Sequence, residues 1–501
     1  MNKLTKPTVG PLLGYREYST DKALQRVLVR GRELDKKQTC YFLVREIGGL
    51  TELRFSKQLR GKNSDYTAII DLDNLPLDTR FEYKVTIAQG TKKSPKFDAL
   101  KGKDCFSGTF ETRNKNDSIT SFVFGSCCHF SLTGLNKADD AAFKTMIEQW
   151  RGPDKINDDF MMMLGDQIYG DHRTGKSFLG KLPVFRQIIL ALKIKNKKKI
   201  NFKHYLSHYK KAFKKINKRK VMSAIPTYMI FDDHEVHNDW GSNKFLKGPE
   251  DYDMLSDAMK AYNIYQVSHP EIKPPLRSKI QFGKVLPVAK YYYKFSHGKS
   301  GFFVMDTRFN KVPLNESESN KEQMRMITGV QMNALKTLLS STDHSVKFIA
   351  TSVPMMPDAE LNWLNQRFDN SPQDRWEGHV TQRLEILDYI KQHKIPNVIF
   401  LSGDVHVSYA FSLSHKNDKN FKVHQLTSSA FNWGLGLNDG HFSKGSPLKG
   451  TNNSYIPQNL AGKVINEDNF CRVAVKTNKV DVKFYHAKTG KLLRSVEIDL
   501  V

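Results

Sequence analysis

The feature that most constrains the fold is a series of short apolar segments, each followed directly by polar side chains. The segments cover residues 121–124, 160–164, 225–230, 301–305, 346–350 and 397–401. Short apolar runs bounded by turn residues are typical of buried β-strands. Ligands of open α/β sheets bind just outside the carboxyl ends of the strands. We therefore expect the polar clusters to meet at one edge of a sheet.

A helix is predicted between the first two segments. Phe143, Met146, Ile147 and Trp150 lie at spacings i, i+3, i+4 and i+7, which indicates an amphipathic helix over residues 139–150. Strands that alternate with helices indicate an α/β domain. We assign it residues 119–501, including a basic insertion near 181–220 and a closing antiparallel meander over 471–498.

The first part of the chain, residues 1–115, has a different pattern. Short alternating or β-branched runs at 27–29, 39–44, 66–70, 81–85 and 108–112 are separated by turn residues. This spacing predicts a small all-β sandwich of immunoglobulin- or fibronectin-like type. A length of 501 residues also favours two domains.

Composition and charge limit the possible disulfides, partners and location of the protein. Five cysteines are too few and too scattered for a disulfide framework, and the net charge of +26 attracts polyanions. No apolar run approaches the roughly 18 residues that cross a bilayer. Residues 1–20 show neither an apolar signal segment nor a twin-arginine pair, so the expected location is cytoplasmic.

The most basic stretch runs from Lys193 to Lys220 and is interleaved with Phe202, Tyr205 and Phe213. Charge runs of this kind usually form a solvated helix face. The alternative is an electropositive collar that attracts an anionic substrate, a polyanion or an acidic membrane.

The ten residues FDDHEVHNDW at 231–240 hold four carboxylates and two imidazoles. A surface acidic loop is one interpretation of this segment. The other is a metal site, because oxygen and nitrogen ligands together suit a divalent or trivalent cation that offsets their repulsion.

A wider set of residues favours the metal site. The residues that follow predicted strands include Cys127, Asp166, Tyr169, Asp233, His234, Asp404 and His406. A carboxylate between two ions, surrounded by nitrogen, thiolate and phenolate ligands, fits a two-metal hydrolytic site at which the metals activate a water molecule. Thiolate or phenolate favours a ferric ion on one side, and the oxygen-rich side suits Ca, Mg or Mn.

Several motifs together resemble those of the PhoD-type alkaline phosphatase and phosphodiesterase family, a branch of the calcineurin-like metallophosphatases. They are FGSC (124–127), LGDQIYGD (164–171), FDDHEVHNDW (231–240), MDTRF (305–309) and LSGDVHVS (401–408), with further similarity at 331–335, at 374–378 and at Arg383. The resemblance covers most of 119–501. It implies an α/β metallophosphatase fold of two packed β-sheets flanked by helices, preceded by the N-terminal sandwich.

The resemblance also implies the roles of single residues. Cys127 and Tyr169 would bind iron (Fe³⁺), Asp166 would bridge to calcium (Ca²⁺), and Mg, Mn or Zn are substitute metals. The implied set is completed by Asp233, Asp404 and His406, with Asn238 as a further calcium-side ligand. His234 would stabilise or protonate the leaving oxygen.

Some roles stay open at this point. Cys128 follows Cys127, so either thiol is a candidate ligand, although Cys127 is better aligned. Arg308 either pairs with Asp306 inside the protein or contacts the substrate phosphate. We expect His129, His237 and His424 to be bystanders or to support the ligands.

The leading functional hypothesis is metal-dependent hydrolysis of phosphoric esters. Monoesters and diesters, including cell-wall polymers and phospholipids, are all candidate substrates under the resemblance. The alternative is a protein that binds nucleic acid or acidic membrane through the basic stretch and has a vestigial metal site. We infer an anionic phosphorylated substrate and no obligate protein partner.

Overall fold

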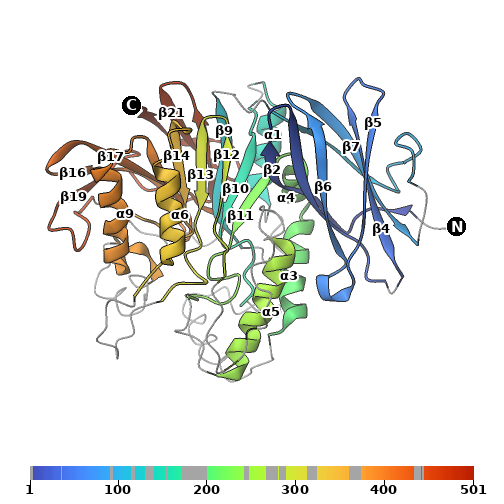
Figure 1. Cartoon of the computed structure of the whole chain (residues 1–501), viewed down its shortest axis with the longest axis horizontal. Helices are drawn as coiled ribbons and strands as arrows, with labels where there is room; N and C mark the ends of the chain where they lie inside the picture. Colours follow the sequence, from blue (N-terminus) through green and yellow to red (C-terminus); the bar gives the residue numbers. More distant parts are fainter. Residues whose placement is uncertain are drawn as a thin grey trace.

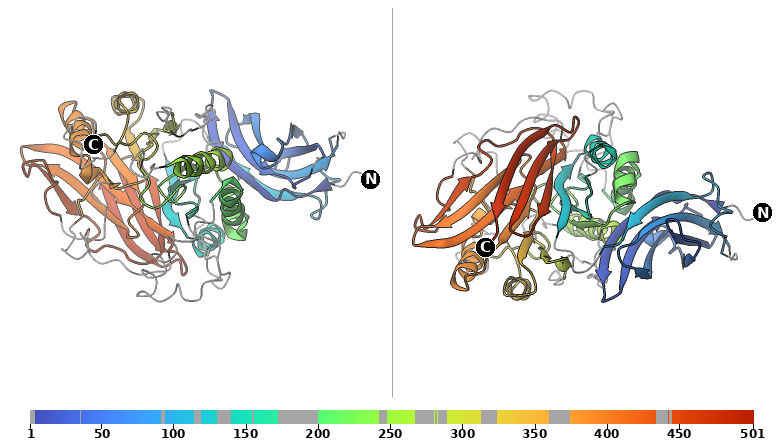
Figure 2. Two further views of the ribbon diagram at one scale, coloured as in Figure 1. Left: turned by 90° about the horizontal axis from the view of Figure 1, so that it is seen from below. Right: turned by 90° about the horizontal axis from the view of Figure 1, so that it is seen from above.

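The computed structural model describes residues 4–34, 36–90, 94–113, 119–129, 140–153, 156–171, 200–241, 248–266, 280, 282, 289–312, 324–359, 374–433, 442 and 445–501. An N-terminal β-region lies at one end and two larger sheets with their helices lie beside it (Figure 1). The two termini lie on opposite sides of the molecule (Figure 2). No helix in these ranges is both long and apolar enough to span a membrane.

The N-terminal β-region, defined as the described residues of 4–113, consists of two sheets around a shared core. One sheet contains β1 (Leu4–Thr5), β4 (Gln38–Glu46), β5 (Glu52–Gln58), β7 (Arg80–Gln89) and β8 (Phe106–Glu111). The other contains β2 (Val9–Tyr18), β3 (Lys22–Arg30) and β6 (Thr67–Pro76). Alternate residues such as Cys40, Phe42 and Val44 of β4 enter the core, as the period of two in a strand requires. This part is all-β as expected, and its immunoglobulin- or fibronectin-like type stays a prediction.

The first large sheet carries the first three of the predicted strand ends. Its order is β11 (Thr227–Ile230), β10 (Phe160–Leu164), β9 (Thr120–Cys128), β20 (Asn469–Val475), β21 (Lys479–His486) and β22 (Leu492–Asp499), and β18 (Ser429–Asn432) also pairs with β9. Strands β9, β10 and β11 are parallel, so their carboxyl ends meet at one edge. The antiparallel β20, β21 and β22 confirm the predicted meander.

The second large sheet carries the other predicted strand ends. Its order is β12 (Tyr293–His297), β13 (Ser300–Val304), β14 (Val346–Ala350), β15 (Val398–Ser402), β17 (Asp418–Thr427), β16 (Tyr409–His415) and β19 (Tyr455–Asn459). Strands β13, β14, β15 and β17 are parallel.

Aromatic side chains join the two large sheets. The Phe122 ring stacks on Phe160 at 5.1 Å between centroids and meets the edges of Phe302 and Phe348 at 5.4 and 5.2 Å. The next residues along β13 and β14, Phe303 and Ile349, enter a second core on the opposite face. Such alternation of apolar residues to both faces is what a sheet buried on both sides requires.

Helices cover the outer faces of both large sheets (Figure 1). The helices α6 (Gly329–Leu339) and α9 (Val380–Gln392) pack on the second sheet through its outer core. The helices α1 (Ala141–Arg151), α3 (Phe202–Lys214), α4 (Ile216–Met222) and α5 (Pro249–Tyr265) share the core of the first sheet. The helix predicted at 139–150 is present as α1, which begins at Ala141 and ends at Arg151.

Part of the basic stretch can be described. Residues 200–220 form α3 and most of α4, whose Tyr205, Tyr209 and Phe213 are buried, so its aromatic residues build core. Lys218 is also fully buried, whereas Lys211 is exposed. The part of the basic insertion at 181–199 lies outside the described residues.

One prediction about a strand is corrected, and a long strand that the sequence did not predict is present. The strand expected to end at residue 124 continues to Cys128 because β18 pairs with its extension, at Ser429↔Ser126 and Asn432↔Cys128. The strand β2 was not predicted, because its sequence VGPLLGYREY contains two glycines and a proline that mask the alternating pattern.

Candidate metal centre

The end of β9 and the loops after β10, β11 and β15 converge, as the strand directions predict. Among the described residues, three groups have potential ligand atoms within 4.8 Å of one another. They are Cys127, Asp166 and His406; Asp166, Asp233 and His234; and Asp232, Asp233 and Asp404. Because Asp166 and Asp233 each belong to two groups, the three form one continuous cluster.

The backbone at this cluster is unusual. Cys127, Asp166, Asp404 and His406 have φ values of 55°, 55°, 71° and 56°. A residue other than glycine in this left-handed region costs about 1 kcal/mol or more. Four such residues in one cluster indicate that the loops are shaped for the positions of their side chains.

Cys127 is the thiol that faces the cluster. Its Sγ lies 3.5 Å from Oδ2 of Asp166 and accepts a hydrogen bond of 3.1 Å from the Ser429 hydroxyl. Burial, and then the charge of Asp166, raise the pKa of Cys127 well above its usual value. Cys128 instead belongs to the hydrophobic core, so the structure favours Cys127 of the two thiols.

Tyr169 lies beside the same carboxylate. Its hydroxyl donates to Oδ2 of Asp166 at 3.2 Å, and its ring is 4.3 Å from the ring of His234. Burial, and then the charge of Asp166, raise the pKa of Tyr169 well above 10. The Trp433 ring stacks on the His406 ring at 3.7 Å and closes this side of the cluster.

The carboxylates are buried together. Burial raises the pKa of Asp166 well above 3.8, and burial together with Asp232 does the same for Asp404. Oδ1 of Asp166 and Oδ2 of Asp232 are buried and accept no hydrogen bond from the described residues. Buried oxygen atoms without donors, beside a thiol and imidazoles, fit the coordination of metal cations, whose charge would offset the repulsion.

His234 is held by a second carboxylate. Its Nδ1 lies 3.0 Å from Oδ1 of Asp171. Burial lowers the pKa of His234, but Asp171 and the other carboxylates outweigh that effect and raise it well above 6.5. Asn238 is exposed, and its backbone N–H donates to Asp171 at 3.2 Å, so its predicted role as a ligand stays a prediction.

Arg308 lies inside the protein, underneath the carboxylates. Its guanidinium binds the carboxylates of Asp232 and Asp374, and its Nη2 is 4.0 Å from Asp233 and 3.9 Å from Asp404. The side chain is 0% exposed. Asp306, the partner considered from the sequence, accepts the backbone N–H of Arg308 at 3.0 Å instead.

Several supporting residues were given no individual role from the sequence: Asp171, Asp232, Glu235, Asp374, Arg375 and Ser429. Glu235 accepts the backbone N–H groups of Asp166 and Gln167 at 3.0 and 2.7 Å and so fixes the loop after β10. Nε of Arg375 lies 3.5 Å from Oδ2 of Asp404. Most of these residues lie within the motifs described in the sequence analysis, and that position could have pointed to them. Ser429 lies outside those motifs.

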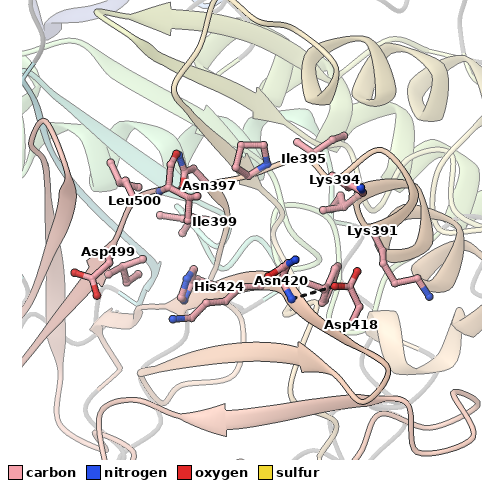
Figure 3. A pocket seen from close by; sticks show the side chains of 16 residues that line it. Lys391, Lys394, Ile395, Asn397, Ile399, Asp418, Asn420, His424, Asp499 and Leu500 are labelled. Atoms are coloured by element: carbon pink, nitrogen blue, oxygen red, sulfur yellow. Dashed lines mark hydrogen bonds between the residues drawn. The ribbon is translucent and has the colours of Figure 1, made fainter.

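His424 lies apart from this cluster. It lines a cavity of about 200 Å³ at the amino end of β15, opposite the metal-site end, together with Ile399, Asn397 and Leu500 (Figure 3). Burial, and then Lys422, lower the pKa of His424 to about 4. His424 therefore plays no part in the cluster.

Two packed sheets with this cluster at the carboxyl ends of their parallel strands define a metallophosphatase-like protein. The PhoD-like phosphatase family model matches residues 122–483, and the chain therefore belongs to that family. The family implies metal cofactors.

Three similar proteins agree with this class. Alkaline phosphatase D of Bacillus subtilis (strain 168) is 27% identical over 227 residues, which span 43% of this chain and only 36% of that protein. The solved structure of PhoD covers 98% of this chain and 89% of its own, at 17% identity and a TM-score of 0.66. The solved structure of the purple acid phosphatase PPD1 of yellow lupin covers 99% of this chain and 74% of its own, at 11% identity and a TM-score of 0.57. These two structures bear on the fold alone.

Proposed function

We propose that the protein hydrolyses phosphoric esters, monoesters or diesters or both, at a two-metal site. The observation that carries this proposal is that Asp166 is shared by two ligand groups and has a buried oxygen without a donor. One ion would be held by Cys127 and Tyr169, and the other on the side of Asp233 and Asp404, with iron and calcium as the metals that the donor types favour. Bound metals would supply an activated water and neutralise charge on the phosphate.

His234 is the proposed proton donor to the leaving oxygen. The contact between Asp171 and Nδ1 orients the ring and leaves Nε2 as the atom for the leaving group. This role agrees with the position of His234 in the second ligand group, beside Asp166 and Asp233.

We assign Arg308 to positioning the carboxylates, because its buried guanidinium already binds Asp232 and Asp374. Arg375 is the better candidate for contact with the substrate phosphate. Its side chain is 14% exposed and borders Asp404. Arginine presents paired N–H groups that match phosphate oxygens.

The division into an immunoglobulin-like module at 1–115 and a phosphatase domain at 119–501 is part of this proposal. It is supported by the separate core of the N-terminal β-region. A cytoplasmic location and a weak polyanion contact through the basic stretch also stay proposals.

The test measures hydrolysis of a p-nitrophenyl monoester and diester side by side, before and after chelation, with elemental analysis of the protein. We expect Asp166→Ala to lose bound metal and to lower turnover by at least about 100-fold, because the side chain would serve both ions. Asp73→Asn is the control, since Asp73 is exposed on β6 of the N-terminal β-region.

Full metal content and normal turnover in Asp166→Ala would refute the bridging role. Salt-sensitive binding of nucleic acid that survives chelation, together with no hydrolysis of either ester, would favour the polyanion-binding alternative.

A further inference from the structure

A second cavity lies where the N-terminal β-region meets the first large sheet and its helices. Its volume is about 620 Å³, and its walls come from β8, the end of α1 and the segments before β10 and β11. The cavity therefore borders the amino ends of β10 and β11, and candidate metal ligands follow the carboxyl ends of the same two strands. Along the five residues of β10 the two sites are separated by roughly 15 Å, at about 3.3 Å per residue.

The charged groups around this cavity are unbalanced. The cations are Arg16, Arg80, Arg113, Arg151 and Lys220, and the anions are Glu111, Asp158 and Asp159. All three carboxylates are already paired: Asp158 binds Arg472, and Arg113 binds both Glu111 and Asp159.

The remaining cations have no such partners. Within the described part of the chain, no ion pair or side-chain hydrogen bond involves Arg80, Arg151 or Lys220, and all three are exposed at the rim. They therefore leave three positive charges available to a bound anion.

Arg16 points to the kind of ligand. The residue is 5% exposed; its Nε donates to Gln25 at 2.7 Å and its Nη1 to the Glu111 carbonyl at 2.7 Å. Its Nη2 is buried without an acceptor among the described residues. An unsatisfied buried guanidinium donor is costly, and an oxyanion in the cavity would satisfy it.

We propose that this cavity binds a small organic polyanion with at least two phosphate- or sulfonate-type groups, separately from the metal centre. Arg16 contacts one group from the floor, and Arg80, Arg151 and Lys220 bind the others at the rim. The partly buried Phe106, Trp150 and Ile225 offer apolar surface to the carbon skeleton. Pockets between domains are common ligand sites, and the size of this one suits a molecule of that kind.

The test is calorimetric titration of the full-length protein with naphthalene-1,3,6-trisulfonate at physiological ionic strength. Sulfonates present three oxygens as a phosphate group does, but they are not hydrolysed by a phosphatase. We expect saturable binding, and an affinity at least tenfold weaker in Arg80→Ala/Arg151→Ala. The matched control is Lys57→Ala/Lys101→Ala, which removes the same net charge from exposed sites outside the cavity, and we expect it to stay within twofold of the unmodified protein.

Equal losses in the two double variants would mean attraction by net charge alone and would overturn the proposal. So would an absence of saturable binding, or unchanged affinity in Arg80→Ala/Arg151→Ala. Hydrolysis of the ester reporters should be the same in all three proteins. A failure of the proposed anion site is therefore distinguishable from a failure of the proposed phosphoric ester hydrolysis.

Discussion

At the scale of single residues, the cluster combines strain with burial. The left-handed backbone of Cys127, Asp166 and His406 costs free energy in the protein without bound metal. Burial of the Asp166 carboxylate, which raises its pKa, costs further free energy. Such costs concentrate at functional sites, where a bound ligand offsets them. Arg308 and Lys311 reduce the electrostatic cost of the buried carboxylates by binding Asp374. They lower the pKa of Asp374, although burial alone would raise it.

His424 yields a prediction about acid stability. Its pKa of about 4 in the folded protein is below the ordinary 6.5, so the unfolded chain binds more protons between these pH values. Stability should therefore fall as pH decreases from about 6.5 towards 4. Between pH 7.5 and pH 5, we expect the free energy of unfolding to fall by roughly 2 kcal/mol less in His424→Gln than in the unmodified protein, as measured by urea denaturation. The exposed His393→Gln serves as the control, and a parallel loss in His424→Gln and the unmodified protein would contradict the prediction.

At the scale of elements, the junctions between strand and loop decide the site. Gly165 has a φ of +100°, and a Cβ there would lie 2.4 Å from Cβ of Asp232. A Cβ at Gly403 would lie 2.1 Å from Oγ of Ser126. The glycines of the two Gly-Asp motifs therefore allow the loops after β10 and β15 to approach their neighbours, which brings Asp166 and Asp404 into one cluster.

The helix α6 offers a separate test of local structure. The Thr328 side chain caps its first turn by accepting the Gln331 N–H at 3.2 Å. We expect Thr328→Ala to lower the free energy of unfolding by about 1 kcal/mol, because that N–H loses its acceptor. Thr328→Ser keeps the hydroxyl and should lose much less, as measured by thermal or urea unfolding. Equal losses in the two variants would show that the methyl group, not the cap, is responsible.

At the scale of the whole molecule, the N-terminal β-region is joined closely to the rest of the described chain. Val9, Leu12 and Tyr15 of β2 belong to the core of the first large sheet. The helices α3 and α4 also contact β2, and the Tyr83 hydroxyl adds a hydrogen bond to the Ser223 carbonyl at 2.7 Å.

We therefore expect removal of residues 1–113 to leave a protein that is insoluble or melts at a clearly lower temperature, because apolar side chains beneath β2 become exposed. Tyr83→Phe, which deletes one hydrogen bond, should cost only about 1 kcal/mol. Differential scanning calorimetry compares the three proteins. An unchanged melting temperature after truncation would show that the two parts are independent.

The sequence by itself determined the strands that lead into the cluster and the chemistry of its side chains. Short, largely apolar runs specify β10, β14 and their neighbours, since burial on both faces leaves few alternatives. Parallel strands align their carboxyl ends, and so Cys127, Asp166, Asp233, Asp404 and His406 could be grouped before any contact was known.

Only the tertiary structure decided which partners surround those residues. That Arg308 binds Asp232 and Asp374, that Ser429 donates to Cys127 and that β18 extends β9 depend on residues 66 to 304 positions apart in the chain. The cavity at Arg16 likewise exists only because the N-terminal β-region packs against the first large sheet. Local patterns carry no record of such pairings, because the free energy that selects them comes from burial and hydrogen bonding between distant segments.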